Sequence, residues 1–262
     1  MNEEIWVFST GGQADITKWE RICVMKEHFS IISALDWHPT TNLLLSASTD
    51  RAVIVWEEGK NADGDTFIPM MGITPEKKAC TDSTWNTIGN KFCVGSSSGF
   101  VYVGTYSDKQ NFWVANPLKK KALHSASVTS VRFDPLSGRA VASASLDGSI
   151  TITSAFVEGI EHPSDGPFGK VESRGEELIK LSGSGWVNGL AFSPSSNILA
   201  FVTHDCEVNF LTDLSKSINA DKKERPEACK MLHVGNPHLS CMFVDDNTML
   251  AAGYDKVPYV YK

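Results

Sequence analysis

Short runs of alternating apolar and polar residues, separated by turn residues, recur along the chain. The clearest example lies between His28 and Trp56, where alternating runs at 32–38 and 42–48 flank a Pro-Thr-Thr-Asn turn. A third run, Ala-Val-Ile-Val-Trp, follows directly after a tight Thr-Asp-Arg connection. Alternation bounded by turn residues is typical of short antiparallel strands. The pattern therefore predicts three strands in this stretch and an all-β fold.

The same unit recurs about every fifty residues. Asp50 has counterparts after later strand pairs, at intervals of 49, 48, 58 and 50 residues: Gly99, Asp147, Asp205 and Asp255. Six residues after each comes a third-strand position: Trp56, Thr105, Thr153, Leu211 and Tyr261. Self-similarity at a fixed period is the signature of a repeat architecture. An upstream histidine at the matching distance is clear only at His28 and His124.

Strand-like segments between these units complete the count. Residues 3–8 have the pattern of a lone third strand, and we expect outer strands at 19–25, 65–73 and 110–118. Together with the five units they predict about 21 strands. Residues 157–184 break the rhythm with prolines, glycines and a charged tract, so we expect an inserted surface loop there.

The unit at 28–56 resembles a complete WD repeat. In such repeats a histidine, a hydroxyl residue, an aspartate and a tryptophan form one hydrogen-bonded set. The resemblance implies that His28, Ser46 (or Ser48), Asp50 and Trp56 form it here. Buried polar groups of this kind are tolerated inside a sheet when they satisfy one another. We therefore expect residues 1–262 to be a single WD-repeat β-propeller domain, an all-β fold whose closed form has four to eight blades.

Several longer sequence segments are more specific than the general WD-repeat pattern. The segments at 34–56, 90–103, 113–121, 185–205 and 250–261 resemble the WD-repeat subunit of the actin-related protein 2/3 complex, most specifically Ser-Gly-Trp-Val-Asn-Gly, Phe-Val-Thr-His-Asp and Ala-Ala-Gly-Tyr-Asp. The resemblance implies a seven-bladed ring in full length, of which five to six blades' worth is present here. It also implies first strands, a long insertion and a closing blade that this sequence lacks, so we expect an incomplete ring that dimerises, swaps or is marginally stable.

This resemblance further implies a non-catalytic scaffold in the cytoplasmic actin cytoskeleton. Its expected partners are the other subunits of the complex, actin filaments (mainly through the complex) and the acidic tails of nucleation-promoting factors. The alternative is a stand-alone WD-repeat adaptor that binds peptides or proteins, as a G-protein-beta-like hub does. Fold by itself does not decide between the two.

Composition and charge argue against several classes of partner and site. The net charge is −7 with no long basic cluster, which argues against nucleic acid. No apolar run reaches the roughly 18 residues of a membrane helix, and the acidic N-terminus is not a secretory signal. The six cysteines form no Cys-x-x-Cys pair, so we expect reduced core residues of a cytosolic protein. The histidines have no metal-ligand spacing, and we predict neither a metal nor a cofactor.

Three local features remain as candidate sites. His204-Asp205-Cys206 invites a catalytic interpretation, but neighbouring strand residues point to opposite faces, and we interpret the tripeptide as a turn. Lys119, Lys120 and Lys121, with Trp113, form a basic spot that could receive part of an acidic tail, the alternative being a solvated loop. In the insertion, Pro167-Phe168-Gly169 could dock a neighbouring subunit or be a tolerated loop.

Overall fold

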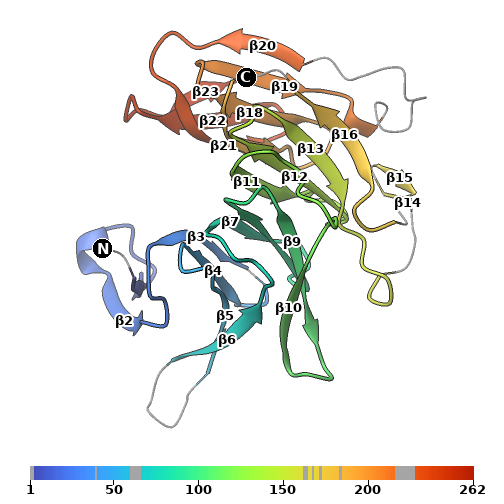
Figure 1. The fold of residues 1–262 in the computed structure, drawn as a ribbon. Helices are drawn as coiled ribbons and strands as arrows, with labels where there is room; N and C mark the ends of the chain where they lie inside the picture. The colour runs from blue at the N-terminus through green and yellow to red at the C-terminus, as the bar shows by residue number, and fades with distance from the viewer. Residues whose placement is uncertain are drawn as a thin grey trace.

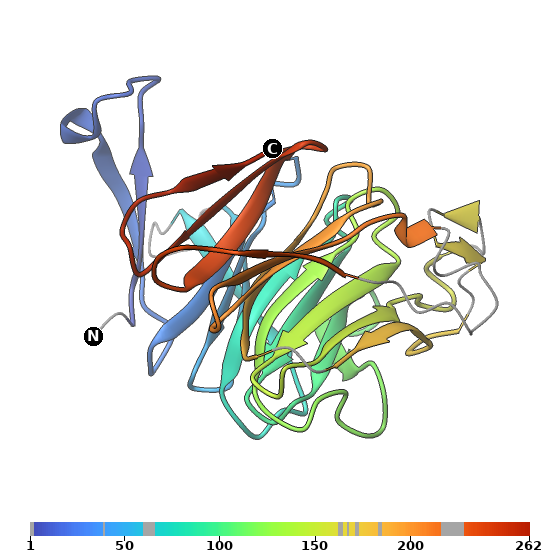
Figure 2. The same ribbon diagram turned by 90° about the horizontal axis from the view of Figure 1, so that it is seen from above.

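The computed structural model describes residues 3–38, 40–59, 66–161, 165–166, 168–170, 173–182, 185–215 and 228–262. Its strands form antiparallel units of up to four strands, which we call blades, set side by side in an arc (Figure 1). The arc begins with a two-stranded sheet of β1 (Ile5–Ser9) and β2 (Glu20–Met25), with a 3-10 turn at Ile16–Lys18 between them. This hairpin extends beyond the rest of the chain in the turned view (Figure 2).

Four four-stranded blades follow. The first contains β3 (Ile32–Trp37), β4 (Leu44–Ser48), β5 (Val53–Glu58) and β6 (Phe67–Ile73). The second contains β7 (Cys80–Trp85), β8 (Lys91–Ser96), β9 (Val101–Ser107) and β10 (Phe112–Pro117). The outer strands β6 and β10 pair in parallel, which joins these two blades into one eight-stranded sheet. The third contains β11 (Val128–Phe133), β12 (Ala140–Ser145), β13 (Ile150–Ser154) and β16 (Glu177–Leu181). The fourth contains β17 (Val187–Phe192), β18 (Leu199–Thr203), β19 (Glu207–Leu211) and β20 (Ala228–Leu232).

The final blade has β21 (His238–Asp245), β22 (Thr248–Gly253) and β23 (Tyr259–Tyr261). The described residues form 23 strands, and 21 remain when the two-residue strands β14 (Asp165–Gly166) and β15 (Gly169–Lys170) are set aside. Repeat counting predicts that number. The expected strands near 3–8, 19–25, 65–73 and 110–118 are confirmed as β1, β2, β6 and β10.

The inserted segment is more ordered than the sequence predicts. Within 157–184, β16 pairs antiparallel with β13 and completes the third blade, so this part of the expected surface loop is wrong. Phe168 is 3% exposed and packs against Phe192 of the fourth blade. Glycines and prolines hid the strand because they interrupt the apolar alternation around it.

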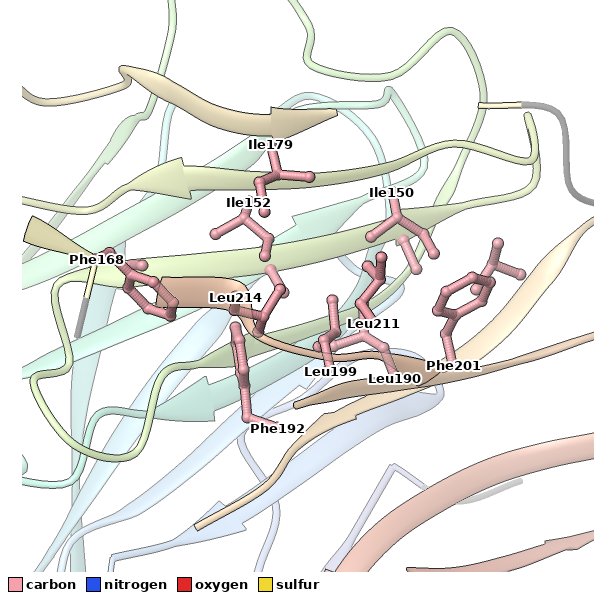
Figure 3. Close-up of a cluster of buried hydrophobic side chains, with 14 of the residues drawn as sticks. Ile150, Ile152, Phe168, Ile179, Leu190, Phe192, Leu199, Phe201, Leu211 and Leu214 are labelled. Atoms are coloured by element: carbon pink, nitrogen blue, oxygen red, sulfur yellow. The ribbon is translucent and has the colours of Figure 1, made fainter. Parts of the chain in front are cut away.

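Blades adhere through apolar faces. Between the third and fourth blades, Ile150, Ile152 and Ile179 face Leu199 and Leu211, together with Phe168 and Phe201 (Figure 3). Burying each such side chain stabilises the fold by about 1.5–3 kcal/mol. Second strands are buried on both faces, as β4, β12 and β18 are along their whole length. Their residues are accordingly apolar or small, and the serines among them are buried as well.

Polar side chains also join successive blades at the inner strands β3, β7, β11, β17 and β21. The Asp36 carboxylate accepts the backbone N–H of Trp85 in the next blade at 2.6 Å, and the Thr129 hydroxyl donates to the carbonyl of Val187 at 2.6 Å. Residues from all five inner strands line one polar cavity of about 170 Å³. The five strands therefore surround a common axis, which is the geometry of a propeller.

Candidate functional site: the turn face of the propeller

In each blade, the loop before the inner strand and the turn between the second and third strands lie at the same end. We call this end the turn face; it comprises residues 26–31, 49–52, 76–79, 97–99, 118–127, 146–148, 185–186, 204–206, 233–237 and 254–256. Hydrogen bonds connect the loop to the turn: the Phe29 N–H donates to the Asp50 carboxylate, and the His204 N–H donates to the carbonyl of Trp186. The expected polar sets and the basic spot belong to this face.

The first complete blade brings together the four residues of the expected polar set. His28 Nδ1 lies 3.0 Å from Asp50 Oδ2, and His28 Nε2 lies 2.7 Å from Ser46 Oγ. Trp56 Nε1 donates to the same Ser46 oxygen at 2.9 Å. A carboxylate only accepts hydrogen bonds, which fixes the direction of the other bonds in the set. Trp56 donates to Ser46, Ser46 donates to His28, and His28 donates to Asp50. Every member is satisfied, and the set fixes the turn to the blade.

The aspartate also organises the backbone of the turn. Asp50 accepts N–H groups from Ala52 at 2.7 Å and Phe29 at 2.9 Å. Burial by itself would raise the pKa of Asp50, but these N–H groups and the His28 ring lower it below its ordinary value. Ser48, the alternative member of the set, instead donates to the carbonyl of Ile31 at 3.0 Å. Ser46 therefore occupies the central position.

The third blade has a variant of the set. His124 lies between two hydroxyls, with Nε2 2.8 Å from Ser143 Oγ and Nδ1 2.7 Å from Ser149 Oγ. Ser149 in turn donates to Asp147, so a serine is inserted between the ring and the carboxylate. Burial lowers the pKa of His124, a shift that Asp147 only partly opposes. Both ring nitrogens of His124 are therefore engaged in hydrogen bonds that hold the turn to the blade.

The final blade contains a set that sequence reasoning missed. His233 Nε2 lies 3.3 Å from Asp255 Oδ2, and His233 Nδ1 lies 3.3 Å from the hydroxyl of Tyr261. Tyr261 takes the place of the tryptophan, and its hydroxyl also lies 2.7 Å from His238 Nε2. The available signal was spacing, because His233 precedes Asp255 by the 22 residues that separate His28 from Asp50.

The second and fourth blades depart from the pattern at the aspartate position. In the second blade the residue is Gly99, whose φ of +82° suits glycine, and an added Cβ would lie 2.3 Å from the carbonyl oxygen of His124. In the fourth blade Asp205 is present and exposed, but it makes no hydrogen bond or ion pair with the described residues. His204 and Cys206 flank it in a turn where Cys206 has a φ of +62°. The expected turn is thus observed.

The structure separates the residues of the basic spot. Lys120 and Lys121 are exposed, whereas Lys119 pairs with Glu177 at 3.3 Å. Trp113 is 4% exposed and packs edge-on against Trp85 in the apolar core. The expected role of Trp113 in a peptide-binding surface is therefore wrong, because its ring is covered by its own sheet.

The candidate docking segment is likewise turned inward. Pro167 lies outside the described residues, and Gly169 pairs with Gly166 in the β14–β15 hairpin. Phe168 is buried in the core between two blades of its own chain. Its ring is therefore unavailable to a neighbouring subunit, which corrects that part of the prediction.

Within the described ranges, no group of three or more histidine, cysteine or acidic side chains is placed to hold a metal ion. No helix in that part of the chain is long and apolar enough to cross a membrane. The six cysteines form no disulfide, and burial raises the pKa of the Cys80 thiol to about 12.

The sequence profile of the WD domain, G-beta repeat family matches residues 19–57, 116–154 and 175–210. Each match begins at an outer strand of one blade (or just before it) and ends in the third strand of the next blade. One sequence repeat therefore contributes to two blades and ties them together.

Curated relatives are similar along almost the whole chain. Actin-related protein 2/3 complex subunit 1A of Arabidopsis thaliana is 29% identical over 99% of this chain and 65% of its own length. Subunit 1A-B of Xenopus laevis is 28% identical, over 99% of this chain and 66% of its own length. Subunit 1 of Schizosaccharomyces pombe is 25% identical, over 94% of this chain and 63% of its own length. The chain thus spans about two thirds of the relatives that it matches; it carries WD repeats, and it resembles subunit 1 of the actin-related protein 2/3 complex from end to end.

Proposed function

We propose that this chain is a non-catalytic scaffold subunit of an actin-related protein 2/3 complex, located in the cytoplasmic actin cytoskeleton. In that role it supports the nucleation of branched actin filaments by holding other subunits together. The observation that carries the proposal is the similarity, over 99% of the chain, to proteins named as subunit 1 of that complex. Its partners are then the other subunits, and it reaches actin filaments mainly through them.

The hydrogen bonds of three histidines support a non-catalytic role. His28, His124 and His233 are each engaged in hydrogen bonds that hold turns to blades. Catalysis by general acid or base requires a side chain within reach of a substrate proton. These rings are buried and already bonded, so they stabilise the propeller instead. The blades leave a broad edge and a turn face for protein contacts.

Contact with nucleation-promoting factors is the finer part of the proposal. Lys120 and Lys121 extend into solvent on the turn face, and an acidic tail would gain encounter rate there. Lys119 contributes less because Glu177 already pairs with it. The contact depends on the two exposed lysines without help from Trp113.

The scaffold role is tested by affinity purification of the tagged chain from its native cytosol, read by mass spectrometry, with tag alone as control. Recovery of both actin-related proteins with the smaller subunits is the expected result. Recovery of unrelated partners would overturn the scaffold proposal and favour the stand-alone adaptor. Recovery of no partner would also contradict it.

The tail contact is tested by a matched pair of charge reversals. Lys120→Glu with Lys121→Glu should weaken binding of an acidic tail peptide at low salt. Lys77→Glu with Lys78→Glu changes the charge equally on the same face, at two other exposed lysines. Equal loss in both variants would mean that only net charge matters, and the site at Lys120 and Lys121 would be rejected.

A further inference from the structure

Two histidine rings share one tyrosine hydroxyl in the final blade. The hydroxyl of Tyr261 lies 2.7 Å from His238 Nε2 and 3.3 Å from His233 Nδ1. The two imidazole rings are in contact, with centroids 4.2 Å apart. Water reaches little of either ring, since His238 is 2% exposed and the His233 side chain is 7% exposed. Two titratable rings are therefore buried side by side.

Hydrogen bonding fixes the position of each proton in the neutral cluster. Asp255 Oδ2 lies 3.3 Å from His233 Nε2, and this nitrogen carries the ring proton because a carboxylate only accepts hydrogen bonds. His233 Nδ1 is then an acceptor, and it takes the hydroxyl proton of Tyr261. Burial raises the pKa of Tyr261, so the hydroxyl keeps this one proton, and His238 Nε2 must donate to its oxygen. The bonds therefore run in one direction, from His238 through Tyr261 and His233 to Asp255.

An added proton disrupts this arrangement at either ring. On His233 it occupies Nδ1, where it meets the hydroxyl proton of Tyr261, and that hydroxyl has to turn away. On His238 it places a charge on a buried ring; burial lowers the pKa of His238, and the neighbouring His233 lowers it further. Charging both rings would add repulsion between centroids that are 4.2 Å apart. The folded cluster therefore favours two neutral rings.

Asp255 is the carboxylate that the structure places in contact with the pair. It partly offsets a charge on His233, but it also accepts the backbone N–H and the side-chain amide of Asn236. Glu207 on β19 pairs with Lys230 on β20 at 3.3 Å. The other titratable side chains on the surrounding elements are His204, Asp205 and Cys206 in the β18–β19 turn, Tyr254 and Lys256 in the β22–β23 turn, and Tyr259 on β23. Solvent screens the charges of the exposed members of this set, so the rings titrate mainly in the field of each other and of Asp255.

The same cluster holds strand β23 in place. β23 has three residues, pairs with residues 249–251 of β22, and directs both of its tyrosines at the histidines. The ring centroid of Tyr259 lies 4.4 Å from that of His233 and 5.3 Å from that of His238. We propose that this cluster is an acid-sensitive switch, in which proton uptake by the histidine pair releases β23 from the final blade. The release changes the shape of the turn face at this blade, and it does not depend on the proposed scaffold role.

The test is amide hydrogen exchange of the folded chain at pH 7.5 and pH 5.5, with protection factors corrected for the intrinsic effect of pH. An opened strand exposes histidines that titrate near their ordinary pKa of about 6.5, whereas the closed cluster keeps them neutral. Each ring that stays neutral when closed therefore increases opening about tenfold between these two pH values. We expect the protection of β23 amides to fall at pH 5.5 by about tenfold or more.

Histidine variants assign the effect to the cluster. His238→Gln removes one titrating ring, so the ratio of the two protection factors should shrink about tenfold. His204→Gln changes an exposed histidine in the neighbouring turn and should leave the ratio unchanged. His124→Gln changes a buried histidine of the third blade, and it should also leave the ratio unchanged because β23 opens without global unfolding.

A measurement on the parent chain keeps the test independent of whether His238→Gln folds. The nitrogen chemical shifts of the histidine rings report which nitrogen carries the proton. At pH 7.5 both His233 and His238 should carry it on Nε2.

Four results would overturn the proposal. Equal protection of β23 at both pH values would exclude acid release, and a ratio that His238→Gln leaves unchanged would place the titration elsewhere. A ratio reduced in His124→Gln would mean that β23 exchanges only through global unfolding. A His233 proton on Nδ1 at pH 7.5 would contradict the direction of the hydrogen bonds.

Discussion

Ser46→Ala should destabilise the propeller far more than the loss of one hydroxyl suggests. Among the described residues, the Ser46 oxygen is the only hydrogen-bond partner of two buried groups, His28 Nε2 and Trp56 Nε1. Both residues are nearly inaccessible, at 5% and 2% exposure. A buried polar group left without a partner costs about 1–3 kcal/mol. Two such groups predict a loss of roughly 2–6 kcal/mol, a large part of the 5–15 kcal/mol that typically stabilises a domain.

Ser83→Ala is the matched control for this variant. Ser83 is 3% exposed on an inner strand, and its hydroxyl makes no hydrogen bond with any residue that the structure describes. Removing it orphans no group, so its free energy of unfolding should change by less than about 1 kcal/mol. The same substitution is thereby compared at two buried sites that differ in bonding.

The assay is urea unfolding, followed by circular dichroism and by tryptophan fluorescence. Ser46→Ala should lower the midpoint with an unchanged slope, and the two probes should coincide. Equal midpoints for Ser46→Ala and Ser83→Ala would refute the reasoning. The His–Ser–Asp–Trp contacts would then be geometry without energetic consequence.

Three further predictions concern pH, backbone and thiol chemistry. Burial lowers the pKa of His124 below 6.5, so the unfolded chain takes up a proton at this residue first on acidification, and the free energy of unfolding should fall below about pH 6.5. His124 contributes at most about 1.4 kcal/mol per pH unit to this slope. A slope that is unchanged in His124→Gln would contradict this. Gly99→Ala should lower the melting temperature because its Cβ meets backbone at 2.3 Å, whereas Gly12→Ala, with a similar φ and open space, should have a much smaller effect. Iodoacetamide at pH 8 should alkylate exposed Cys229 quickly in the native chain and leave Cys80, with a pKa of about 12, unmodified. Mass spectrometry of the peptides measures both rates, and faster alkylation of Cys80 than of Cys229 would contradict the prediction.

Much of the fold follows from local pattern. Alternation and turn residues predict the strands around Asp50, and the repeat period locates the corresponding turns at Asp147 and Asp255. These features depend on neighbours in sequence, since a strand's faces alternate with every residue and a tight turn needs particular residues. The polar set of the first blade is inferred in the same way, because a family pattern marks His28 and Trp56.

What the sequence could not decide involves contacts between segments far apart in the chain. Trp113 reads as an exposed aromatic beside lysines, yet the core rings of its own blade cover it. Phe168 reads as part of a loop, yet the next blade supplies its pocket. His233 was missed because its partner Tyr261 replaces a tryptophan.

Gly99 stands where the other turns have an aspartate, and only the three-dimensional arrangement shows why, because a side chain there would meet the carbonyl oxygen of His124. Sequence by itself determined the strands, the period and the class of this protein, because those depend on local chemistry. Tertiary structure decided which polar and aromatic groups are buried or hydrogen-bonded and which remain exposed on the surface. The physical reason is that burial and hydrogen bonding are set by blades that lie about fifty residues apart in the chain.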